Sequence, residues 1–122
     1  MTDSALSIME RQLGEVTLLS LTGQILLDDG DLLFGRKIRD LIDRGRVEIV
    51  VDLGGVTYID SSGVGMLVAK LKSVREKGGD IRLLHVTTRG QRLFGMLKIL
   101  TVFEVFEDEA QAVRSFAARP GA

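Results

Sequence analysis

The sequence has 122 residues, of which 45% are hydrophobic and 27% charged, the size and balance of one soluble globular domain. It contains no cysteine, which excludes disulfides, thiolate metal sites and cysteine nucleophiles. The formal net charge of -1 provides no field that would attract the chain to nucleic acid or anionic lipid. The first residues do not resemble a signal peptide, and no apolar run approaches the roughly 20 residues that span a bilayer. We therefore expect a cytoplasmic protein without membrane insertion.

The first elements in chain order are two predicted strands. Residues 6–12 have weak strand character, Gly14 marks a turn, and the β-branched, apolar run 16–23 predicts a buried strand. These two strands can form an opening hairpin. Asp28, Asp29 and Asp31 follow as candidate helix caps.

Two amphipathic helices flank the next strand. The first carries apolar residues at helical spacing and ends at Gly45; they are Phe34, Ile38, Leu41 and Ile42. The run 47–53 is rich in valine and isoleucine, as expected of a strand covered on both faces, and we expect Gly54–Gly55 to end it. The second helix extends from Val64 to the glycines 78–79. Its basic residues predict a solvated face that could also guide an acidic partner; they are Lys70, Lys72, Arg75 and Lys77.

The last part of the chain continues the alternation. Residues 81–86 predict a strand, Thr88 could cap a third helix that includes Leu93, Phe94 and Leu97, and residues 103–106 predict a short strand. A fourth helix is expected at about 108–117, before a frayed end at Pro120. Strands that alternate with helices pair in parallel through crossovers, so the order predicts an α/β fold with a mixed sheet and about four helices.

The segment with the clearest chemical meaning is VDLGGVTYIDSSGVG, residues 51–65, which joins a buried strand to an amphipathic helix. Ligands and reactive groups collect at such junctions in α/β sheets. Asp60, Ser61 and Ser62 are all good N-cap residues, and whichever one caps the helix, a serine hydroxyl lies beside its free N–H groups. These groups and the helix dipole favour negative charge, so the site suits a phosphoserine. From the residue pattern alone, a simple cap and turn is the competing interpretation.

The same segment resembles the signature of STAS domains of the anti-sigma-factor-antagonist type, in which a strand leads to a D-S-[ST]-G-[LIV]-G turn that opens a helix. The resemblance extends through GGDIRLLHV, RGQRLFGML and FEVFEDEAQAV, and upstream to LTGQI, and so covers about residues 6–117. It implies a STAS fold and a single domain over residues 1–122.

The resemblance also implies residue roles. Ser61 would be the phosphoacceptor, Asp60 would help to position it, Ser62 would be a secondary hydroxyl, and Gly63 and Gly65 would allow close backbone approach. Met66, Lys70 and Asp28 are candidate partner contacts, although Met66 could equally fill a gap in the core. The partners would be an anti-sigma factor that is also a serine kinase, and a phosphatase. The protein itself would be a monomer without cofactor, metal or enzymatic activity.

Three further observations bear on this interpretation. Members of the family commonly carry an acidic residue three positions after the glycine that matches Gly23, whereas here acid appears only at Asp28 and Asp29, which leaves the kinase partner open. A Ser–His–Asp hydrolase built on Ser61 and His85 is disfavoured because the G-x-S-x-G elbow is absent. A scaffold or accessory-subunit role and a nucleotide-binding module, with Gly54, Gly55 and the glycines after Ser62 near a phosphate, remain as alternatives.

Overall fold

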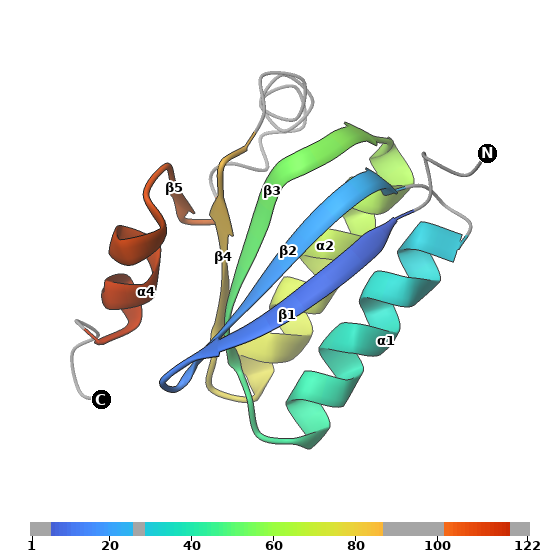
Figure 1. The fold of residues 1–122 in the computed structure, drawn as a ribbon. Helices are drawn as coiled ribbons and strands as arrows, with labels where there is room; N and C mark the ends of the chain where they lie inside the picture. The colour runs from blue at the N-terminus through green and yellow to red at the C-terminus, as the bar shows by residue number, and fades with distance from the viewer. Residues whose placement is uncertain (1–5, 26–28, 87–101, 118–122) are drawn as a thin grey trace.

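The computed structural model describes residues 6–25, 29–86 and 102–117 and shows a five-stranded mixed sheet with the strand order β1-β2-β3-β4-β5 (Figure 1). Strands β1 (Ser7–Leu13) and β2 (Val16–Ile25) form the expected antiparallel hairpin around Gly14, which has a φ of 68°. Strands β3 (Glu48–Ile59), β4 (Asp80–Leu84) and β5 (Val105–Phe106) continue the sheet in parallel. The prediction of an α/β fold with a mixed sheet is confirmed.

Helices cover the sheet from both sides. Helices α1 (Asp29–Asp43) and α2 (Ser61–Glu76) lie side by side on one face, and α4 (Glu109–Ala117) lies on the other, next to β4 and β5 (Figure 1). Successive residues of β2 divide between two apolar clusters, with Leu19 in the larger one under α1 and α2 and Leu18 in the smaller one under α4. This period of two is expected of a strand buried on both faces. The helix expected after Thr88 and the tail at Pro120 lie outside the described residues.

The expectation that Gly54–Gly55 ends the third strand is wrong, because β3 continues to Ile59. The extension pairs with the end of β2, and the register shifts twice, between Ser20 and Thr22 and between Gly23 and Gln24. A Cβ on Gly55 would lie only 2.5 Å from the Thr22 Cγ2 atom. Glycine therefore permits a close approach of β2 at an irregularity, which is a common reason for glycine inside a strand.

The expectation that His85 lies within the fourth strand is also wrong, since β4 ends at Leu84. His85 follows with a φ of 55°, a left-handed conformation that strand residues do not adopt. Its backbone amide still donates to the Phe106 carbonyl oxygen at 3.0 Å. The chain thus turns at His85 while it remains attached to β5.

Candidate functional site

The candidate site is the junction between β3 and α2, at the edge of the sheet where β2 also ends. Ile59 pairs with Ile25, and the next residue, Asp60, has extended backbone dihedrals with φ of -93° and ψ of 177°. Its carbonyl oxygen accepts a 3.0 Å hydrogen bond from the Val64 amide, the first of the helix. Asp60 is therefore the N-cap and Ser61 the first helical residue, which decides among the three cap candidates.

The Asp60 carboxylate satisfies one of the amides at the start of α2. Its Oδ1 atom accepts a 2.8 Å hydrogen bond from the Gly63 amide. This is the usual contact of an N-cap side chain with the third helical residue. The first turn of α2 contains no acidic residue, so the cap is the carboxylate that offsets the positive end of the helix.

Gly63 packs directly onto the end of the sheet. A Cβ at this position would lie 2.7 Å from the Ile25 carbonyl oxygen and 2.9 Å from the Ile59 Cγ1 atom. The close backbone approach expected at Gly63 is therefore present. At Gly65, by contrast, a Cβ would meet nothing within 4 Å among the described residues, so the domain itself makes no such approach there and an approach by a partner stays a prediction.

The two serines differ in exposure. Ser61 is exposed and Ser62 is half-buried, while Gly63 and Val64 are buried. Residues four apart share a helix face, so Ser61 lies on the same face as the exposed residues Gly65 and Ala69. The Ser61 side chain is accessible to another protein.

The candidate partner contacts occupy different environments. Met66 is half-buried and packs against the large apolar cluster, so it serves the core at least in part. Lys70 is half-buried, and its Cε atom lies 3.4 Å from the position that a Cβ on Gly35 of α1 would take. Its aliphatic stem therefore crosses toward α1. Asp28 lies outside the described residues.

The expected basic face of α2 is only partly free. Arg75 donates from Nε to the Asp80 Oδ1 atom at 2.9 Å and from Nη2 to the Val102 carbonyl oxygen at 2.8 Å. Arg75 therefore ties the end of α2 to β4 and to the chain before β5.

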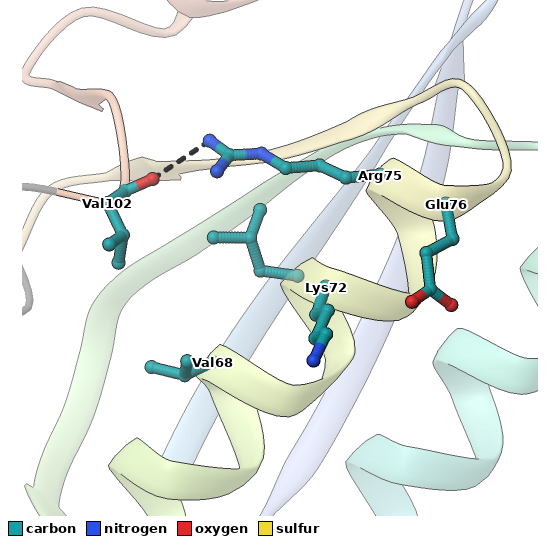
Figure 2. A pocket seen from close by; sticks show the side chains of 6 residues that line it. Val68, Lys72, Arg75, Glu76 and Val102 are labelled. Atoms are coloured by element: carbon teal, nitrogen blue, oxygen red, sulfur yellow. Dashed lines mark hydrogen bonds between the residues drawn. The ribbon is translucent and has the colours of Figure 1, made fainter.

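Beside Arg75 lies a groove of about 410 Å³ that the sequence pattern did not indicate (Figure 2). Its lining comprises Val68, Leu71, Lys72, Arg75, Glu76 and Val102.

His85 does pair with an aspartate, but not near Ser61. Its Nδ1 atom lies 3.1 Å from the Asp52 Oδ1 atom, which also accepts from the Gly54 amide at 2.9 Å. The part of β3 from Asp52 to Ile59 spans roughly 20 Å at the usual rise per strand residue. The serine, histidine and aspartate of a hydrolase are thus not brought together.

The described part of the chain offers neither a metal site nor a membrane-spanning helix. Over residues 6–25, 29–86 and 102–117, no group of three or more His, Asp or Glu side chains is arranged to hold a metal ion. Within these ranges no helix combines the length and apolar character that crossing a membrane requires.

Comparison with known proteins identifies the family. The model of the STAS domain matches residues 7–112. The anti-sigma F factor antagonist of Paenibacillus polymyxa is 26% identical over 106 residues, which cover 86% of this chain and 89% of that protein. A solved Thermotoga maritima protein has a TM-score of 0.82 at 20% identity, over 88% of this chain and 92% of its own.

A second structural relative is known in two states. The anti-sigma factor antagonist SpoIIAA in its unphosphorylated form has a TM-score of 0.70 at 19% identity, over 93% of this chain and 100% of its own. The phosphorylated form of Bacillus SpoIIAA gives 0.72 at 19% identity, over 90% of this chain and 99% of its own. Since the family model spans most of the sequence, this chain belongs to the STAS domain family.

Proposed function

We propose that this protein is an anti-sigma factor antagonist that is switched by phosphorylation of Ser61. In the unphosphorylated state it binds an anti-sigma factor that is also a serine kinase, and thereby frees a sigma factor. The observation that carries the proposal is the exposed Ser61 at the first position of α2, in the DSSG turn of a STAS domain. The name of the Paenibacillus relative and the two solved states of SpoIIAA support it.

Phosphate at this position would change the surface while the fold persists. Ser61 is outside both apolar clusters, so a phosphoryl group on its hydroxyl displaces no core side chain. It adds close to two negative charges beside helix amides that favour an anion. A partner that covers this end of α2 would have to desolvate that charge next to Asp60, and the cost falls on the complex.

The docking surface that we propose is the outer face of α2. Ser61 and Ala69 present small side chains there and Gly65 presents none, which would let the backbone of a partner approach closely. Met66 and Lys70 flank this face with half-buried side chains that can supply apolar contact and positive charge. Phosphorylated Ser61 would place its charge at the N-terminal end of this surface.

Two measurements test the proposal. The purified protein is incubated with the candidate anti-sigma kinase of its host and ATP, and intact mass is expected to show one added phosphoryl group on wild type and on Ser62→Ala, but none on Ser61→Ala. Titration calorimetry is expected to show that Ser61→Ala binds the kinase as wild type does, and that the phosphorylated protein binds at least tenfold more weakly. A phosphoryl group that persists in Ser61→Ala would refute the site.

The nucleotide-binding alternative has little support at two of its glycines. Gly54 and Gly55 lie inside β3, and Gly55 pairs with Thr22 of β2. A phosphate-binding loop needs backbone amides that point into free space, whereas a strand directs them toward its neighbours. We therefore place the function in protein–protein recognition.

A further inference from the structure

The turn that presents Ser61 is fixed to the rest of the domain through the backbone and side chain of Asp60. Its amide donates to the Ile25 carbonyl oxygen at 3.3 Å, its carbonyl oxygen accepts from Val64, and its Oδ1 atom accepts from Gly63 at 2.8 Å. The residue directly before the phosphoacceptor thus makes three hydrogen bonds to three different partners. Only the third of these depends on its side chain.

The side-chain bond matters because Gly63 is the contact point between α2 and the sheet. The Ile25 carbonyl oxygen accepts from Asp60 and also lies where a Cβ of Gly63 would be, 2.7 Å away. The capping bond therefore links Asp60 to Gly63, and both residues contact the Ile25 carbonyl oxygen at the end of β2. With the side facing the sheet fixed in this way, the adjoining residue Ser61 is directed outward, where it is exposed.

We propose that Asp60 is a positioning residue for phosphorylation, and that it acts by capping α2 rather than by its negative charge. This inference rests on the proposed function of Ser61. In the transfer, the Ser61 hydroxyl oxygen bonds to the γ-phosphorus of ATP, the bond from that phosphorus to the bridging oxygen breaks, ADP leaves, and the hydroxyl proton passes to the kinase. A kinase needs the Ser61 hydroxyl in one geometry. If the first turn of α2 is open in a fraction of the molecules, the hydroxyl has that geometry in fewer of them.

Two substitutions separate the cap from the charge. Asp60→Asn keeps a side-chain oxygen that can accept from the Gly63 amide and removes the charge, whereas Asp60→Ala removes both. Loss of a helix cap changes the ratio of closed to open states by about fivefold. Because the rate follows the population of the closed turn, we expect Asp60→Ala to be phosphorylated more slowly than wild type, by at most about fivefold, and Asp60→Asn to be phosphorylated faster than Asp60→Ala and within about twofold of wild type.

A second capping aspartate in the chain supplies the matched control. The Asp108 Oδ1 atom accepts from the amides of Ala110 at 2.8 Å and Gln111 at 3.2 Å at the start of α4, on the opposite side of the sheet. Asp108→Ala should cost similar stability and leave the phosphorylation rate of Ser61 unchanged. An equal fall in the rate for Asp108→Ala would overturn the inference, because the effect would then reflect global stability.

Amide hydrogen exchange gives a readout that needs no kinase. The Gly63 amide is expected to exchange about fivefold faster in Asp60→Ala than in wild type, and to stay protected in Asp60→Asn. Equal exchange in all three proteins, or a fast phosphorylation of Asp60→Ala despite an open turn, would overturn the inference. If wild type accepts no phosphate at Ser61, the proposed function fails instead, and the exchange rates still decide whether Asp60 fixes the turn.

Discussion

Gly63 and Gly65 allow a quantitative test of how the Ser61 turn is packed, because they lie two residues apart in α2 and have opposite surroundings. Replacement of either glycine by alanine in a helix gains about 1 kcal/mol of intrinsic helix stability. At Gly65 the new methyl group meets nothing within 4 Å among the described residues, so this gain should be realised. At Gly63 the methyl group would lie 2.7 Å from the Ile25 carbonyl oxygen and 2.9 Å from Ile59.

The clash at Gly63 cannot be relieved cheaply, because one of the two atoms belongs to the backbone of β2. Such overpacking typically costs about 1–3 kcal/mol. Gly65→Ala is therefore expected to raise the free energy of unfolding by up to about 1 kcal/mol, and Gly63→Ala to lower it by up to about 2 kcal/mol. The intrinsic helix term cancels between the two variants, so their difference isolates the contact with the sheet.

Urea unfolding followed by circular dichroism measures both values, with an unchanged m-value as the condition for comparison. With an unchanged m-value, the expected separation of about 1–3 kcal/mol appears as a difference between the urea midpoints of the two variants. Equal unfolding free energies of the two variants would show that Gly63 does not pack tightly against Ile25, which would refute the described geometry of the Ser61 turn.

Three further predictions concern binding, the core and pH. Gly65→Ala should weaken binding of the anti-sigma kinase in calorimetry although it stabilises the fold, and unchanged affinity would place the partner elsewhere. Asp80→Ala should lower the unfolding free energy by about 1–3 kcal/mol, because the Arg82 guanidinium, 6% exposed, loses the carboxylate at 2.9 Å and keeps only the exposed Glu104 carboxylate at 3.7 Å; a loss under about 1 kcal/mol would contradict this. The Lys37 ammonium, 3.0 Å from Glu10, lowers the pKa of that carboxyl. The contribution of this ion pair to the free energy of unfolding, less than about 1 kcal/mol, should be complete above the unfolded pKa near 4.3 and lost as pH falls through the folded pKa. The unfolding free energies of wild type and Glu10→Gln should therefore converge at acid pH.

The parts of the fold that the sequence predicted are those set by local periodicity. The opening hairpin follows from the two strand-forming runs on either side of Gly14, and α2 from apolar residues at helical spacing that are buried in the structure, such as Leu67 and Leu71. The extension of β3 past Gly54–Gly55 could not be predicted in this way. It depends on Thr22 of β2, a residue distant in sequence whose side chain occupies the space that a Cβ on Gly55 would need.

The choice of cap shows the same limit at the site. Asp60, Ser61 and Ser62 have comparable capping tendency, so residue type alone cannot rank them. The ranking is made by the pairing of Ile59 with Ile25, which carries the strand up to the residue before Asp60 and leaves that residue extended. The motif therefore indicated where the chemistry lies, and the neighbouring strand determined which hydroxyl faces outward.

The burial of Arg82 could not be predicted for a related reason, because a basic residue in the run 81–86 is normally expected to be exposed. In the fold its guanidinium lies between the Asp80 carboxylate and the Phe116 ring, 4.1 Å from the ring centroid, and donates to the Ser115 hydroxyl. Two of these three partners come from α4. The charged group thereby helps to hold α4 on the side of the sheet opposite to α1 and α2.

In the proposed switch, one side of the first turn of α2 packs against the sheet and the other side is exposed to a partner. The side that contains Gly63 is closed against β2 and β3, so its geometry is set by the domain itself. The side that contains Ser61 and Gly65 is open, so nothing within the described fold requires those residues to be small. We propose that a phosphate added on the open side would be accommodated by the helix amides and would leave the closed side unchanged. The free-energy change would then fall on the complex with the protein that covers the open side, so that the modification would control binding and leave folding unaffected.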